Sequence, residues 1–245
     1  MIKFCAVALL FISSVSAAAR LTSVDLSYSK GDFAGVYHDA GEKIVLNADL
    51  SETNKFFIGY EHVQRDYTSE IGFYRDALLI GDTVVFKEAK AYVDFVGSYA
   101  GDTVVGAQAA GSLVPHTTYF NNWDLSLGLH YATYDSGDVQ TIQPQFLYFF
   151  NDLVSAGHSS WFYEDGGWHH AHREFVRARH DRFGGELSWA GGENREDVGL
   201  IDQFNAVSLT TTYYHKYGSV FLSLEDYQGQ FRRGSQWGTG LQWLW

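Results

Sequence analysis

The eleven residues that end the chain, SQWGTGLQWLW at positions 235–245, decide its fold. Successive side chains of a β-strand point to opposite faces, so this stretch has two different faces. One face carries Trp237, Thr239, Leu241, Trp243 and Trp245, and the other carries Gln236, Gly238, Gly240 and Gln242. A strand of about 9–11 residues that is aromatic on one face and small and polar on the other is the building unit of transmembrane β-barrels. The stretch therefore predicts a membrane-spanning strand whose tryptophans touch lipid and whose glutamines look into a lumen.

The position of this strand at the end of the chain leads to a second prediction. With its terminal aromatic residue it resembles the closing strand of bacterial outer-membrane proteins, in which that ending is an assembly signal. The residues expected to form the signal are Trp237, Leu241, Trp243 and Trp245. We therefore expect two partners, the lipid bilayer of the outer membrane and the barrel-assembly machinery.

The other end of the chain reads as an export signal. Lys3 is followed by an apolar run over residues 4–12 and then by small residues up to Ala19. The run is too short for a transmembrane helix, which needs about 20 apolar residues. We expect a cleaved signal peptide over residues 1–19 and one barrel domain over residues 20–245. Cys5, the only cysteine, lies in the signal, so the mature barrel has no disulfide.

Composition narrows the class of protein further. The formal net charge is −12, which argues against nucleic acid as a partner because nucleic acid attracts concentrated Lys and Arg. Aromatic residues make up 17% of the chain, with 25 glycines and only two prolines, as expected for strands joined by tight turns. The sequence also predicts no cofactor.

Alternation of apolar and polar residues recurs along the whole chain. It predicts fourteen strands, over residues 21–29, 42–50, 55–66, 72–86, 91–100, 104–114, 123–134, 139–150, 153–163, 171–180, 183–190, 204–214, 219–227 and 235–245. Between them we expect a long surface loop over residues 30–41, a polar loop over residues 191–203, and loops over residues 164–170 and 228–234. The register is ambiguous over residues 72–114 and 171–190, and merging strands there leaves twelve. An even number places both termini on the periplasmic side.

The two faces could also be arranged the other way round. In a soluble β-sandwich or a secreted lipocalin-like binding protein, the aromatic faces would fill a dry core. Against this, aromatic residues gather at the ends of the strands, as in the girdles of membrane barrels. The residues expected in the girdles are Tyr28, Tyr60, Trp123, Tyr131, Tyr134, Tyr163, Tyr213, Tyr227, Trp237 and Trp245. Gly59, Ser126 and Gly128 occupy the opposite faces, as expected for a lumen.

Several short motifs carry a family resemblance. They are Leu21-Thr22-Ser23, the run RDYTSE at residues 65–70, and the layout of strands up to the aromatic terminus. On these the chain resembles the YaiO-type outer-membrane β-barrel family. The resemblance implies the fold and the location but no catalytic residues. The Trp- and His-rich segment around Trp168 and the ending in Trp rather than Phe depart from it.

One pair of residues suggests an enzyme. His158 and Ser160 lie two apart, so they share a strand face, and that face also carries Ala156 and Phe162, which we expect to meet lipid. The pair resembles the base and nucleophile of outer-membrane lipid hydrolases, in which His takes the Ser proton before attack on an ester. The sequence assigns no orienting acid to it, and no Asn-Gly follows Ser160. The alternative is a polar pair where the strand leaves the membrane.

Histidines cluster at Trp168-His169-His170-Ala171-His172. On a strand, His170 and His172 would share a face and could bind a transition metal through ring nitrogens. No Cys or acidic residue stands at a recognisable metal-ligand spacing beside them, so the alternative is a polar external loop.

Charged residues on the polar faces are the candidates for contact with a solute. They are Asp25, Asp49, Glu61, Asp94, Asp124, Arg173, Arg177 and Arg179. Opposed charges inside a barrel either close it by salt bridges or line a selective pore. The chain has no phosphate-binding glycine loop, zinc protease motif or nucleophile elbow. The sequence thus favours a non-enzymatic barrel, structural or pore-like, whose solute or envelope partner it does not name.

Overall fold

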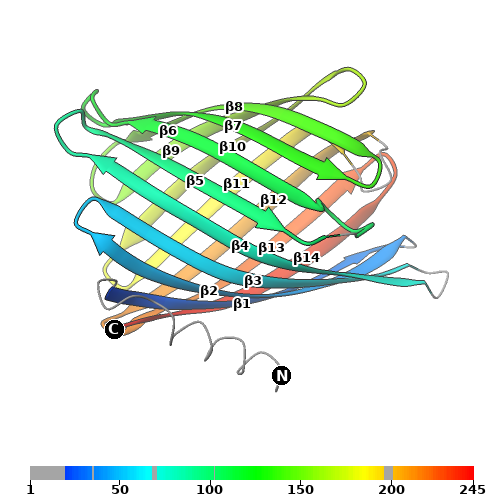
Figure 1. Cartoon of the computed structure of the whole chain (residues 1–245), viewed down its shortest axis with the longest axis horizontal. Coiled ribbons are helices and arrows are strands. Elements are labelled where there is room, and N and C mark those ends of the chain that lie inside the picture. The colour runs from blue at the N-terminus through cyan, green and yellow to red at the C-terminus, as the bar shows by residue number, and fades with distance from the viewer. Residues whose placement is uncertain (1–19, 35, 68–70, 102, 196–200) are drawn as a thin grey trace.

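A computed structural model describes residues 20–34, 36–67, 71–101, 103–195 and 201–245. The expected signal over residues 1–19 lies outside this described part. The strands are β1 (Arg20–Phe33), β2 (Tyr37–Ser51), β3 (Asn54–Tyr67), β4 (Gly72–Phe86), β5 (Ala91–Tyr99), β6 (Ala109–Thr117), β7 (Trp123–Tyr134), β8 (Gly137–Phe149), β9 (Val154–Glu164), β10 (Trp168–His180), β11 (Phe183–Arg195), β12 (Ile201–His215), β13 (Gly218–Gly229) and β14 (Arg233–Leu244). Each strand pairs antiparallel with its neighbours in the chain (Figure 1).

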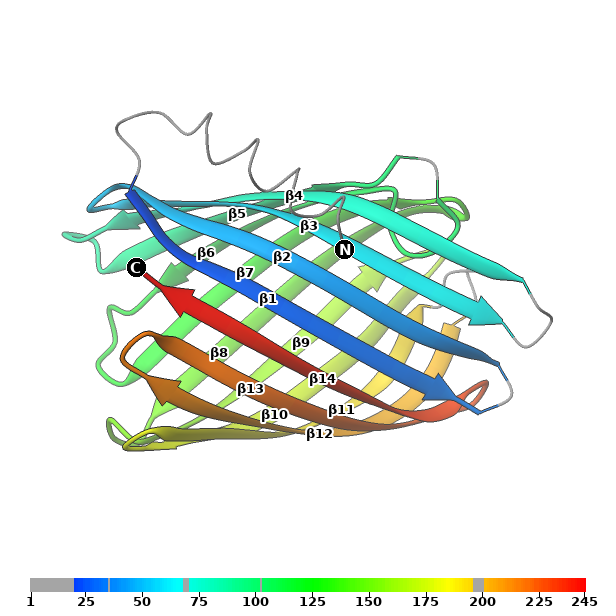
Figure 2. The same ribbon diagram turned by 90° about the horizontal axis from the view of Figure 1, so that it is seen from below.

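The sheet closes on itself, as the last strand pairs with the first. β1 and β14 lie side by side along their length, with Leu26 opposite Leu241 and Ser23 opposite Leu244 (Figure 2). Closure leaves no unpaired sheet edge, which is what allows strands to cross a bilayer. The prediction of fourteen strands is confirmed. Among the described residues no helix is long and apolar enough to span a membrane.

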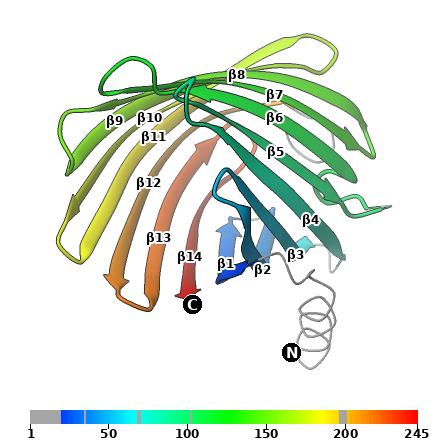
Figure 3. The same ribbon diagram turned by 60° about the vertical axis from the view of Figure 1, so that its left-hand side comes forward.

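The faces point the way that the terminal stretch predicts. Trp237 and Trp243 are 40% and 49% exposed on the outside of the barrel, whereas Gly238 and Gly240 on the inner face are buried. Large apolar side chains are exposed around the whole outer surface, and the strands curve round one interior (Figure 3). A soluble protein rarely exposes such an area of apolar surface. The alternative with aromatic faces in a dry core is therefore wrong.

Three of the aromatic residues expected in the girdles, Tyr134, Tyr163 and Tyr227, fall on the inner face of their strands by alternation. Tyr163 and Tyr227 are only 7% and 5% exposed. Tyr163 stacks on His169, and Tyr227 belongs to a small inner cluster with Phe33 and Tyr37. Both tyrosines stand near a strand end, but their alternation within the strand points them to the lumen. Strand-end position alone therefore does not identify a girdle residue.

Strands occupy much of the sequence expected to form loops, and the long loop predicted over residues 30–41 is wrong. Residues 30–33 belong to β1 and residues 37–41 to β2, while residues 191–195 belong to β11 and residues 201–203 to β12. The extra strand length is stabilised across the hairpin, where Asp32 pairs with His38 at 3.3 Å and the rings of Phe33 and Tyr37 pack at 4.8 Å. Residues 164–170 and 228–234 likewise contain only short turns. Polar, glycine-containing segments thus continue the sheet beyond the apolar band.

Proline also did not end a strand where expected. β6 runs to Thr117 through Pro115, which lies opposite Val93 of β5. On its other side the β6–β7 ladder pairs Leu113 and His116 but skips the residues between them, because proline has no N–H to donate. The strand predicted over residues 104–114 is therefore shifted toward the C-terminus.

Glycine on the lumen face makes room for large rings on neighbouring strands. A Cβ atom on Gly81 would lie 2.1 Å from the ring of Phe57, so the ring lies directly over the glycine. The same arrangement places Phe221 over Gly240 and Phe175 over Gly157. Lumen glycines are therefore packing positions between adjacent strands.

Candidate functional site

The three arginines of β10 that the sequence analysis proposed for contact with a solute all lie on the lumen face. Arg173, Arg177 and Arg179, here called the arginine row, alternate with outward residues of the strand. Arg173 and Arg177 both bond to Glu186 of β11, and the guanidinium of Arg179 lies 4.1 Å from the ring centroid of Tyr214 on β12. The two cations share one carboxylate, so the group keeps a net positive charge, and the third cation lies on an aromatic face.

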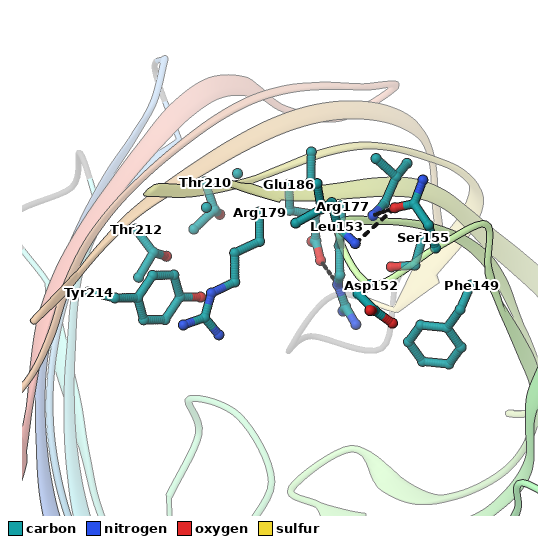
Figure 4. Close-up of a pocket in the computed structure, with 15 residues that line it drawn as sticks. Phe149, Asp152, Leu153, Ser155, Arg177, Arg179, Glu186, Thr210, Thr212 and Tyr214 are labelled. Atoms are coloured by element: carbon teal, nitrogen blue, oxygen red, sulfur yellow. Dashed lines mark hydrogen bonds and ion pairs between the residues drawn. The ribbon is translucent and has the colours of Figure 1, made fainter. Parts of the chain in front are cut away.

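The arginine row opens into a groove near the end of the barrel that carries the termini. The groove has a volume of about 350 Å³ and is bordered by Arg177, Arg179, Glu186, Thr212 and Tyr214. Figure 4 shows the side chains of Arg179 and Tyr214 pointing toward the open interior. Guanidinium groups with free faces bind carboxylates and phosphates well. This groove is suited to contact with an anionic solute.

The predicted lumen acids also face inward, on strands that lie apart from β10. Asp25 accepts a hydrogen bond from Asn47 at 2.8 Å, and Asp49 lies opposite Lys55 in the β2–β3 register. Glu61 pairs with Arg75 at 2.5 Å. These three acids thus line the wall formed by β1, β2 and β3. The partner of Asp25 is a neutral amide, whereas that of Glu61 is an arginine.

Asp94 and Asp124 meet at one histidine that the sequence reading missed. His116 of β6 lies 3.3 Å from Asp94 and 3.2 Å from Asp124, and its ring stacks on Tyr92 with centroids 4.1 Å apart. Tyr92 donates to Asp124 at 2.8 Å. Alternation places all of these residues on the inner face and could have predicted the cluster. It did not, because the strand predicted over residues 104–114 ends before His116. The cluster ties β5, β6 and β7 together on the lumen side.

The opposite mouth of the barrel is narrowed by aromatic rings and an arginine. The guanidinium of Arg232, in the turn after β13, lies 4.3 Å from the ring of Tyr227 and 4.6 Å from that of Phe33. Burial lowers the pKa of Arg232 to about 10, so it is still cationic at neutral pH. A cavity of about 320 Å³ lies beneath it and is bordered by Arg65 and Glu225.

On the outer face the structure completes the pair that the sequence singled out. His158 Nε2 lies 2.8 Å from Ser160 Oγ, and His158 Nδ1 lies 3.0 Å from Glu174 Oε1. We call Ser160, His158 and Glu174 the outer-face triad. Glu174 sits directly opposite His158 in the β9–β10 ladder, and Ser160 sits opposite His172. The three side chains form one hydrogen-bonded chain from hydroxyl to imidazole to carboxylate.

Glu174 was missed because the turn was placed wrongly. The expected loop over residues 164–170 removes the strand pairing, whereas β9 ends at Glu164 and β10 begins at Trp168. Gly166, with φ +67, lies at the centre of this tight turn, a conformation that glycine adopts readily. In a hairpin centred on Gly166, residues equally distant from it face each other, which puts Glu174 opposite His158. The Asp165-Gly166-Gly167 segment was the available signal.

An apolar groove borders the outer-face triad. It has a volume of about 700 Å³ and includes His158 and Glu174 among its walls. The other walls include Trp123, Phe146, Tyr148, Phe150, Val176, Leu187 and Trp189. The ring of Phe146 stacks on His158 with centroids 5.3 Å apart. The triad therefore lies at the edge of an apolar surface on the outside of the barrel.

His170 and His172 lie on the outer face of β10, not in a loop. Their rings are stacked, with centroids 5.6 Å apart and planes at 22°. In the described part of the chain, no group of three or more His, Cys, Asp or Glu side chains is placed to hold a metal ion. The structure thus gives this pair no further ligand.

Comparisons with known proteins agree on the architecture. No family model matches the chain, and neither does any curated protein. Omp33 of Acinetobacter baumannii has a TM-score of 0.53 at 8% identity, covering 92% of this chain and 99% of that one. KdgM porin has a TM-score of 0.51 at 8% identity, covering 89% and 98%. OpdK of Pseudomonas aeruginosa, solved with vanillate, has a TM-score of 0.51 at 8% identity, covering 94% and 98%. The chain has the fold of outer-membrane β-barrel porins.

Proposed function

We propose that this protein is an outer-membrane pore for small hydrophilic solutes, and that the arginine row contacts those that are anionic. The observation that carries the proposal is the groove of about 350 Å³ beside Arg177 and Arg179, inside a closed barrel whose outer face is apolar. A pore needs weak contacts with its solute, because tight binding prevents release. A row of cations in which Glu186 offsets part of the charge of two members meets that condition.

Two further points support the proposal. The barrel fold is shared with KdgM porin, which has also been solved in complex with disordered oligogalacturonate, with a TM-score of 0.51 and 10% identity. Solutes of that class are carboxylate-rich, and guanidinium groups pair well with carboxylates. Export through a signal over residues 1–19, assembly by the barrel-assembly machinery and membership of the YaiO-type family belong to the same proposal.

Conductance across a planar bilayer tests this function. We expect the purified protein to form ion-conducting channels, and Arg179→Glu to shift the reversal potential in a KCl gradient toward cation selectivity. The control is Arg182→Glu, because Arg182 stands in the exposed turn between β10 and β11, outside the groove. A correctly folded protein that conducts no current would overturn the pore. Equal shifts of the reversal potential in the two variants would show that Arg179 has no specific role in ion selectivity.

A further inference from the structure

We infer that the outer-face triad is a catalytic site that hydrolyses an acyl ester of a lipid lying against the barrel. Ser160 is the nucleophile, His158 the general base and Glu174 the group that orients the imidazole. Their separations of 2.8 and 3.0 Å are within hydrogen-bond reach. Nucleophile, base and orienting acid linked in this order define a hydrolytic triad, whatever the fold that carries it.

Other histidines of the barrel show that the arrangement is specific. His62 bonds to Asp76 on the outer face at 2.8 Å, and His169 bonds to Glu193 at 2.9 Å. In the described part of the chain, His158 is the only histidine that bonds an acid through one ring nitrogen and a hydroxyl through the other. A polar pair that merely satisfied its hydrogen bonds would not need the third member.

The location of the triad identifies the class of substrate. The triad lies on the outer face between Phe146 and Phe162, so a molecule reaches it from the bilayer and not from the lumen. Ser160 stands four residues before the end of β9, or about 10 Å along the barrel axis for a strand tilted by about 40°. Ester bonds of membrane lipids lie between the headgroups and the acyl chains, so a site toward one end of a strand and beside an apolar groove is placed to meet them. The apolar walls of the groove of about 700 Å³ can contact the acyl chain of the lipid.

The shielding of the residues fits their roles. Ser160 is 9% exposed, while the side chains of His158 and Glu174 are partly open toward the groove. On the other side of Ser160 the β8–β9 ladder is interrupted, since it pairs Ile142 and Gln145 but not the two residues between them. One of those two is Pro144, which has no N–H. His172 lies directly opposite Ser160 in the β9–β10 ladder, and in this mechanism it is the cross-strand side chain that would donate a hydrogen bond to the oxyanion.

The chemistry balances with water as the only co-reactant. Ser160 Oγ attacks the ester carbonyl carbon while its proton passes to His158 Nε2, and Glu174 holds the Nδ1 proton of the resulting imidazolium. The C–O bond to the lipid alcohol then breaks, and His158 returns the proton to the leaving oxygen. Water, deprotonated by His158, attacks the acyl-serine, the bond to Oγ breaks, and Oγ regains its proton. The products are a fatty acid and the deacylated lipid.

Release of fatty acid from defined lipids tests the inference. The purified barrel is incubated in mixed micelles with phosphatidylethanolamine in one arm and with lipid A in the other, and free fatty acids are quantified by mass spectrometry. We expect release in at least one arm, with a loss of about 10³-fold or more in Ser160→Ala and of about 10²-fold or more in Glu174→Ala. The arm that reacts identifies the source of the ester.

Matched controls separate catalysis from folding. Ser159→Ala removes the neighbouring serine, which faces the lumen and bonds Gln145, and His62→Asn removes a histidine that pairs with an acid but with no serine. Both variants should keep the wild-type rate, and heat-modifiable gel mobility should show every variant folded.

An alkyl fluorophosphonate should label Ser160, as read from the mass of its peptide. Hydrolysis lost in Ser160→Ala supports the site, and so does label on Ser160 when neither lipid is hydrolysed. Hydrolysis at an equal rate in Ser160→Ala and the unmodified protein overturns it, and so does the absence of both hydrolysis and label. Conductance does not involve these residues, so either function can fail alone.

Discussion

At the scale of single residues, Asp202 organises the mouth of the barrel. It is completely buried and accepts hydrogen bonds from Tyr227 Oη at 2.9 Å and from the backbone N–H of Gln230 and Phe231 at 2.6 and 3.0 Å. The acid therefore folds the turn after β13 inward and brings Arg232 over the aromatic rings. A buried carboxylate is stable only with such a set of donors.

Replacing Asp202 with Ala should lower the free energy of unfolding by about 1–3 kcal/mol, because three donors lose their acceptor. Equilibrium unfolding in urea, with the barrel in detergent micelles, measures the change. The matched control is Asp226→Ala, which removes an exposed acid that bonds only Gln228 in the contacts described, and which should change little. Equal costs for the two variants would mean that burial of Asp202 contributes nothing.

At the scale of one strand, the outer and inner faces obey different chemistry. On β12, Leu209 is exposed among other apolar residues of the outer face, whereas Thr210 borders the lumen groove. The two residues are adjacent in the chain, and both lie near the middle of the strand. Any difference between them therefore reports the environment of the face alone.

Arginine placed on the two faces should have very different costs. We expect Leu209→Arg to lower the free energy of unfolding by about 2–4 kcal/mol, because the charge would enter hydrocarbon near the midplane. Thr210→Arg should be tolerated, since the lumen offers room and water. Reversible unfolding from lipid vesicles provides both values. If Thr210→Arg were the more costly change, the assignment of the faces would be reversed.

At the scale of the whole molecule, the closing strand joins the two ends of the chain. β14 pairs with β1 over its length, and the backbone N–H of Trp245 donates to the carbonyl of Thr22 at 3.2 Å. Its outward tryptophans are exposed, so they are open to lipid and also to an assembly factor. Closure is thus completed by the pairing of the first and last strands of the barrel.

Deleting Trp245 should reduce the amount of folded barrel in the outer membrane of cells, while the purified variant still refolds in detergent. Trp245→Phe should assemble normally, because it keeps a terminal aromatic residue. Membrane fractionation with heat-modifiable gel mobility measures assembly, and refolding in micelles serves as the control for stability. Normal assembly of the deleted chain would exclude a signal at the last residue.

Alternation of side chains along the backbone made much of this barrel predictable. The number of strands, the lipid-facing tryptophans of β14 and the inward side chains of Glu61 and the arginine row all follow from the two-residue period. That period is a covalent property of an extended chain, so local sequence is enough to read it. The short turns, such as the one between β9 and β10, were not predictable in this way, because charged and glycine-rich residues occur both in loops and in strands.

The sequence by itself therefore determined which face meets lipid and which meets the lumen in the strands that alternate clearly, such as β7 and β14. Only the tertiary structure decided which residues meet across strands, such as His116 with two aspartates, and Glu174 with His158. The physical reason is register: a partner across a hairpin depends on the centre of the turn, and moving that centre exchanges every partner on both strands. Gly166 sets that centre for β9 and β10, and with it the outer-face triad.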